Sequence, residues 1–174
     1  MKTIITIALF MGLIACQGTQ TDNDYSADAN KISESEITSA KLNAETTKQL
    51  VTGYLKIKDA LVNTNAEKAA YAADEILFNL EQNNSKVVSQ LLKEVQLIKQ
   101  TKDVDEQRIY FEGLSFNIYT LVKNTSIEMN LYQQYCPMAF DDKGAYWLSD
   151  EKKVFNPYFG DEMLRCGKVI ELIE

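Results

Sequence analysis

A helical repeat of apolar residues between about Asn43 and Thr125 constrains the fold of this chain more than any other feature. In each segment of this stretch, apolar side chains recur every three or four residues, which places them on one face of a helix. The runs are Leu50, Tyr54, Ile57 and Leu61; Ala69 to Leu80; Val88 to Ile98; and Phe111 to Val122. Short polar segments separate the runs, so the sequence predicts a mainly α fold, an antiparallel four-helix bundle with short connections.

Polar residues at the expected helix starts support this division. Asn65 and Ser85 precede the second and third apolar runs, and both residue types favour the N-cap position. Asp103 and Glu106 have the spacing of a capping box before the fourth run.

The pattern changes after Asn124. Ile127, Met129 and Leu131 alternate with polar residues, which is the period of a strand. Aromatic residues, glycines and both prolines of the chain then gather in residues 135–167. The sequence predicts a loop-rich, aromatic C-terminal cap with short strands over about residues 127–174. Irregular segments on a regular scaffold commonly carry function, so we expect the functional site in the cap.

The N-terminal residues are typical of an export signal. One lysine precedes an apolar run from Ile4 to Ile14, which is too short to span a bilayer at about 20 residues. Leu13-Ile14-Ala15-Cys16 resembles the lipobox of bacterial lipoproteins. This resemblance implies a signal peptide over residues 1–15, lipidation at Cys16 and a membrane anchor through the attached lipid.

The segment after Cys16 is poor in large apolar residues, so the sequence predicts a flexible tether over residues 16–41. The folded domain is then expected over residues 42–174. We expect a bacterial cell-envelope protein, lipid-anchored and facing the periplasm or the cell surface. The chain carries 25 acidic against 18 basic residues, a net charge of −7, which argues against nucleic acid as a partner.

The residue types that are missing argue against catalysis. The chain contains no histidine, which excludes Ser-His and Cys-His nucleophilic catalysis and histidine-ligated zinc. Carboxylates are plentiful, but no pair is singled out by spacing. We therefore expect a protein that is not an enzyme.

Four sulfur residues of the cap form two short motifs. Cys136 and Met138 follow a Cys-x-Met pattern, and Met163 and Cys166 follow Met-x-x-Cys. Thiolates and thioethers select soft metal ions, above all Cu(I). The sequence therefore offers a metal site made of two thiolates and two thioethers.

A disulfide between Cys136 and Cys166 is the alternative. Cysteines of exported proteins usually pair, and this bond would close a loop of about 30 residues, contributing roughly 3–4 kcal/mol. Each methionine, taken alone, is better explained as a side chain that fills the core, and it is their place within three residues of a cysteine that favours a ligand role. A reversible cysteine pair would bind metal only when it is reduced.

Three motifs in this region, YCPMAF, KGAYWLS and NPYFG followed by M-x-x-C-G, resemble an uncharacterised bacterial domain of unknown function. That domain occurs in small lipoproteins and at the end of periplasmic adaptor subunits of heavy-metal RND efflux pumps. The resemblance covers roughly residues 50–173. It implies copper handling in the envelope, with an efflux adaptor as a partner.

Two functions are therefore expected. The first is an envelope lipoprotein that binds Cu(I) through Cys136, Met138, Met163 and Cys166 and buffers the ion or delivers it to a metal efflux system. The second is a non-catalytic protein-interaction module whose cap is stapled by the Cys136–Cys166 disulfide.

Overall fold

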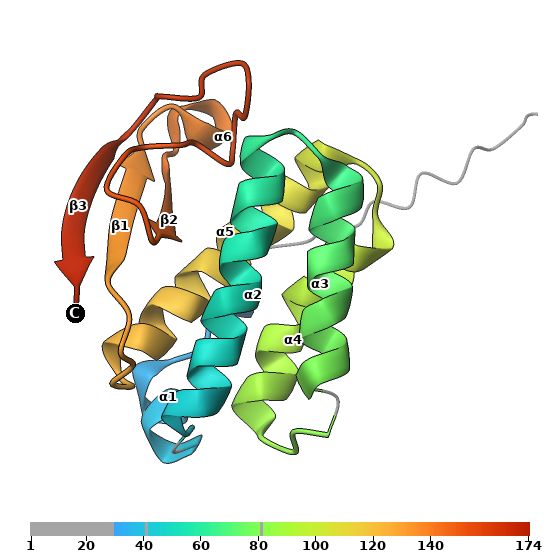
Figure 1. Cartoon of the computed structure of the whole chain (residues 1–174), viewed down its shortest axis with the longest axis vertical. Helices are drawn as coiled ribbons and strands as arrows, with labels where there is room; N and C mark the ends of the chain where they lie inside the picture. The colour runs from blue at the N-terminus through green and yellow to red at the C-terminus, as the bar shows by residue number, and fades with distance from the viewer. Residues whose placement is uncertain (1–29, 41, 81) are drawn as a thin grey trace, which may run out of the picture.

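The computed structural model describes residues 30–40, 42–80 and 82–174. This part of the chain is mainly helical, with a small three-stranded antiparallel sheet formed by its C-terminal residues (Figure 1). The four long helices are α2 (Ala44–Val62), α3 (Ala66–Leu80), α4 (Lys86–Gln100) and α5 (Val104–Lys123). They coincide with the four helical segments expected from the apolar repeat. No helix within the described ranges has the length and apolar character needed to cross a membrane.

The long helices bury the apolar positions that the repeat identified. Consecutive helices run in opposite directions, and α2 packs against α3 and α5, while α4 packs against α3 and α5 (Figure 1). The core between them contains the expected residues of each run, among them Leu50, Tyr54, Ile57, Leu61, Ala69, Ala73, Val88, Leu91, Phe111 and Ile118.

The N-caps are only partly as expected. The Asn65 side-chain oxygen accepts a hydrogen bond from the Lys68 backbone N–H at 2.9 Å. The Asp103 carboxylate accepts from the backbone N–H of Asp105 and of Glu106. Ser85 stands at the N-cap position of α4, but its side chain makes no capping hydrogen bond.

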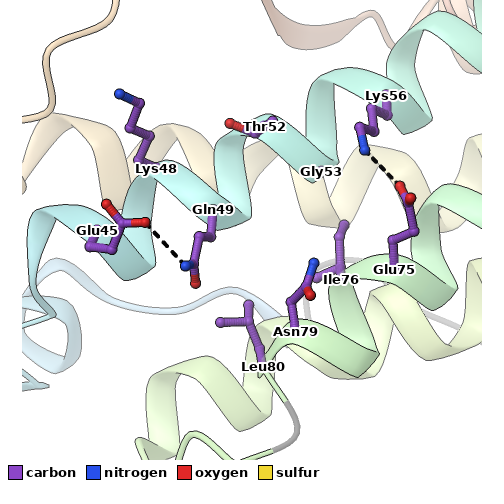
Figure 2. Close-up of a pocket in the computed structure, with 10 residues that line it drawn as sticks. All are labelled: Glu45, Lys48, Gln49, Thr52, Gly53, Lys56, Glu75, Ile76, Asn79 and Leu80. Carbon is purple, nitrogen blue, oxygen red and sulfur yellow. Dashed lines mark hydrogen bonds and ion pairs between the residues drawn. The ribbon is translucent and has the colours of Figure 1, made fainter.

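Helices α2 and α3 approach closely because Gly53 has no side chain. A Cβ atom at this position would overlap the side chain of Ile76 on α3. Figure 2 shows Ile76 directed at Gly53, with the ion pair between Lys56 and Glu75 alongside at 2.7 Å. The small residue on α2 therefore sets the distance between these two helices.

The N-terminal boundary of the folded part differs from the expected one. Residues 16–41 were expected to be a flexible tether, whereas α1 (Glu34–Ala40) packs against α4 and α5. Ile32 and Ile37 are buried, and the Ile32 N–H donates to the Asn117 side chain at 2.8 Å. Two well-placed isoleucines are enough to attach this polar segment to the helices. The expected leader, and Cys16 with its lipid, lie outside the described residues.

The sheet consists of β1 (Leu131–Cys136), β2 (Ala145–Ser149) and β3 (Lys168–Ile173) in the order β2-β1-β3. The short α6 (Ala139–Asp142) lies between β1 and β2. The first strand was expected to begin at Ile127, but it begins four residues later. Ile127 and Met129 pack, partly buried, against the core instead.

One tyrosine joins the sheet to the helices. The ring of Tyr54 on α2 stacks on Phe111 of α5, with ring centroids 4.9 Å apart. Its buried hydroxyl accepts a hydrogen bond from the Leu148 backbone N–H of β2 and shares one with Ser115 of α5, both at 2.9 Å. The cap, residues 127–174, is thereby fixed to two helices at once.

Candidate sulfur site in the cap

The fold brings the two cysteines of the cap into contact. Cys136 is the last residue of the central strand β1 and is fully buried, and Cys166 lies two residues before β3. Because Tyr135 pairs with Lys168 across the sheet, both cysteines reach the same end of it. Their sulfur atoms are 3.0 Å apart, and both are free thiols.

This contact changes the acidity of one thiol. The hydrogen bond with Cys136 raises the pKa of Cys166 from 9.0 to about 11, and burial and the charge of an ionised Cys136 act in the same direction. The backbone N–H of Met138 acts in the opposite direction by stabilising the Cys166 thiolate. In the reduced protein Cys166 is therefore protonated at neutral pH and is a weak nucleophile.

A buried asparagine shapes the loop that carries Cys166. The Asn156 side-chain N–H donates to the Cys166 carbonyl at 2.8 Å, and its oxygen accepts from the Tyr158 N–H at 2.8 Å. Its backbone N–H donates to the Leu164 carbonyl at 2.9 Å. Its local sequence gives no sign of these contacts, which reach eight and ten residues along the chain.

Gly167 permits the close approach of this loop to the sheet. Its φ is +140°, a conformation that L side chains rarely adopt. An added Cβ atom would lie 2.9 Å from the Tyr135 carbonyl oxygen and 3.0 Å from the ring of Trp147. The Cys-Gly pair that ends the last motif thus places Cys166 next to β1.

The two methionines share a hollow that neither cysteine lines. Met138 and Met163 border it together with Asp141 and Asp142, and its volume is about 560 Å³. Met138 is 47% exposed, so this residue does not serve as core filler. The structure thus pairs the cysteines and places both methionines around one hollow.

The carboxylates do not complete a metal site of the usual kind. Over residues 30–40, 42–80 and 82–174, no three or more His, Cys, Asp or Glu side chains cluster in a way that could hold a metal ion. A metal bound in the cap would therefore depend on the sulfur atoms.

The backbone next to Met138 is strained. Phe140, Asp141 and Asp142 have φ values of 52°, 56° and 63°, so three consecutive non-glycine residues are left-handed. Gly144 follows with a φ of 78°. Strain of this kind persists only where surrounding contacts enforce it, and it is concentrated at ligand sites and switches.

Two cations help to attach the cap, and neither was recognised in the sequence. Arg108 of α5 donates from Nε to the Pro157 carbonyl at 3.0 Å. Lys58 of α2 is buried and lies 2.7 Å from Asp59 and 3.6 Å from Asp150 at the end of β2. The sequence carries one sign of this role of Lys58. The residue lies three positions before Leu61, on the face of the first apolar run that is expected to be buried.

Arg165 contacts the segment at Val154 and Phe155. Its guanidinium donates to the Val154 carbonyl at 2.9 Å and lies over the Phe155 ring, 4.0 Å from the centroid. Among the aromatic residues of the cap, Trp147 and Tyr158 are buried, Phe159 is partly buried and Tyr146 is exposed.

Comparison with known proteins adds a match to the helical part. Residues 50–130 match the model of a family described as "Protein of unknown function (DUF3347)". No curated protein and no solved structure matches the chain. The matched range ends just before β1, so the sulfur motifs from Tyr135 onward lie outside it. The match supports an uncharacterised domain of unknown function.

Proposed function

We propose that the cap binds a soft metal ion, Cu(I) by preference, through the thiolates of Cys136 and Cys166. The observation that carries this proposal is the contact of two reduced thiols, 3.0 Å apart, from segments 30 residues apart in a chain without histidine. Thiolate is a ligand that Cu(I) prefers to the nitrogen and oxygen donors that harder ions need. Met138 and Met163 would add thioether ligands from the neighbouring hollow.

The donor set fits such an ion after a small opening of the pair. Two thiolates at about 2.3 Å from a tetrahedral ion are about 3.8 Å apart, somewhat more than the present sulfur separation. Metal binding must also displace protons, because the pKa of Cys166 is raised to about 11. An ion with a high affinity for thiolate can displace these protons, and a weakly thiophilic ion such as Mg²⁺ cannot.

The proposal places this site on a non-enzymatic envelope protein. We interpret α2 to α5 as an antiparallel four-helix bundle that carries the cap, and Cys16 as the lipidated residue that anchors it.

Replacing Cys16 with Ser should move the protein from the membrane fraction to the soluble fraction of the cell. Retention of the variant in the membrane fraction would contradict the anchor. Delivery of the ion to a metal efflux adaptor would complete the function.

The test is a competition titration of the full chain carrying Cys16→Ser, so that Cys136 and Cys166 are the remaining thiols. The reduced protein is titrated with Cu(I) against a chromogenic Cu(I) chelator, and it should compete at sub-micromolar free ion. Cys136→Ser should abolish competition, and Met138→Leu should weaken it. Met129→Leu, outside the hollow, serves as the matched control. Failure of the parent protein to compete would refute the proposal.

The short distance between the sulfur atoms of Cys136 and Cys166 also favours a second function, that of a disulfide-stapled interaction module. Sulfur atoms 3.0 Å apart need to approach by only about 1 Å to form a disulfide. The two thiols would lose two protons and two electrons to an external thiol oxidant. The product would be a stapled cap that docks on another envelope protein. Counting thiols before and after reduction distinguishes the two, because this function requires no free thiol in the isolated protein.

A further inference from the structure

A second hollow lies on the opposite side of β1 and β2 from the loop that carries Cys166, between the sheet and helix α5. It has a volume of about 240 Å³. From α5 it is lined by Glu112, Ser115, Phe116 and Tyr119, whose spacing places them on one helix face. From the sheet it is lined mainly by Gln133, Tyr146 and Leu148.

The strand register explains which sheet residues reach this hollow. Gln133 of β1 pairs with Leu148 of β2, so their side chains lie in one row on the same face of the sheet. Tyr146, two residues before Leu148, projects from the same face. The hollow is therefore bordered by the rings of Phe116 and Tyr119 from the helix and of Tyr146 from the sheet. The amide of Gln133 lies on the sheet side of it.

The amide of Gln133 lines this hollow and has no protein partner among the described residues. Gln133 is only 9% exposed, and among the described residues its side chain has no hydrogen-bond partner. The next residue, Gln134, is fully buried and donates to the Glu151 carbonyl at 2.8 Å. The amide atoms of Gln133 keep some access to the hollow, so a ligand or water there is expected to complete their hydrogen bonds.

Two of the three hydroxyl groups around Gln133 are already engaged, and the third, of Tyr146, belongs to a residue that is 49% exposed. Ser115 shares its hydrogen bond with Tyr54 at 2.9 Å, and the Tyr119 hydroxyl donates to Glu171 at 2.7 Å. Gln133 is thus the group that would select a ligand by hydrogen bonding. The Gln133 amide offers an N–H donor and a carbonyl acceptor side by side. A ligand that pairs with both needs an acceptor and a donor in the same plane, as another amide has.

The volume of the hollow and the charge at its border limit which ligands it can bind. An apolar cavity of about 150 Å³ admits benzene, so a hollow of this volume holds one substituted ring. The carboxylate of Glu112 at its border disfavours anions. We propose that this hollow is a binding site for a small, flat, uncharged molecule whose amide-like edge pairs with Gln133 while its ring packs between Phe116 and Tyr146.

Benzamide is the probe that tests this site, because it combines one ring with one primary amide. Binding to the full chain is measured by the emission of Trp147, the single tryptophan of the chain, which also lines the hollow. Ligand-observed NMR provides a second readout. Benzoate, which has the same shape and a negative charge, should bind at least about tenfold more weakly. Toluene lacks the amide and serves as the apolar reference.

Gln133→Leu removes the amide and keeps a similar side-chain volume. This variant should bind benzamide about tenfold more weakly, the loss expected for one hydrogen-bonded partner, and toluene with unchanged affinity. Gln96→Leu makes the same change on the exposed face of α4 and should leave both affinities unchanged. If Gln133→Leu does not fold, Phe116→Ala, at a half-exposed wall position, should weaken benzamide binding several-fold.

The proposal is overturned by any of three results. The first is the absence of benzamide binding up to its solubility limit, which would mean that water alone completes Gln133. The second is equal affinity of the parent chain and Gln133→Leu for benzamide. The third is a preference for benzoate over benzamide. Because none of the four sulfur residues lines this hollow, these results are independent of the metal titration.

Discussion

Removing the Cys136 thiol should make Cys166 much more reactive. The pKa of Cys166 is raised from 9.0 to about 11, first by the hydrogen bond with Cys136, then by burial, then by the charge of Cys136. A shift of this size lowers the thiolate fraction at weakly alkaline pH by roughly one hundredfold. Only the thiolate reacts with iodoacetamide. Cys136→Ala removes the first and third causes and leaves burial, so the alkylation rate should rise by about ten- to one hundredfold.

The assay is the pH-dependent rate of alkylation of Cys166, followed by mass spectrometry of the Cys166 peptide. The protein is fully reduced and carries Cys16→Ser. The same chain unfolded in urea gives the rate of an ordinary thiol. We expect the folded parent to react far more slowly than this reference and the Cys136→Ala variant to approach it. Equal rates in the parent and the variant would refute the role of the thiol contact.

The same shift predicts how stability depends on pH. Since the folded-state pKa of Cys166 lies above its unfolded value, the folded state favours the protonated thiol. The stability that this group contributes is fully present below about pH 9 and is lost as the pH rises towards 11. The urea midpoint of the reduced protein should therefore fall across this range by more than that of Cys166→Ser.

Two further substitutions test the packing of the fold. Tyr54→Phe leaves the Leu148 N–H buried without its partner, so it should lower the free energy of unfolding by about 1–3 kcal/mol in urea denaturation. Tyr71→Phe makes the same change at an exposed position and should have no measurable effect. Gly53→Ala forces a Cβ atom into the side chain of Ile76 and should destabilise by about 1–3 kcal/mol; an unchanged urea midpoint would show that α2 and α3 can separate without cost.

The helices could be predicted because their signals are local. A run such as Leu50 to Leu61 encodes its helix through neighbours three and four residues apart, and the cap at Asn65 acts within one turn. The attachment of α1 could not be predicted in this way. It depends on Ile32 contacting Asn117, 85 residues later, while the surrounding sequence has the composition of a tether.

In the sulfur site, too, the sequence predicted what depends on local motifs and missed what depends on contacts between distant residues. The motifs identified which residues carry sulfur, but the contact of Cys136 with Cys166 depends on the antiparallel pairing of β1 with β3. That pairing has a register shift between Gln133 and Gln134, which no period in the sequence indicates. The positions of Met138 and Met163 depend on two loops without a repeating pattern. Their placement around one hollow was therefore beyond sequence reasoning.

The two cysteines differ in how freely they can move, and this difference bears on both proposed functions. Cys136 is fully buried in the central strand and pairs with Ala145, so its displacement would disturb the sheet. Cys166 lies outside the strands, in a loop held by Asn156 and by its own N–H, which donates to the Met163 carbonyl at 3.0 Å. Opening the pair for a metal or closing it to a disulfide therefore requires movement mainly of Cys166. Because Met163 belongs to the same turn, a shift of Cys166 also moves that methionine. The fold thereby couples the thiol pair to the neighbouring hollow.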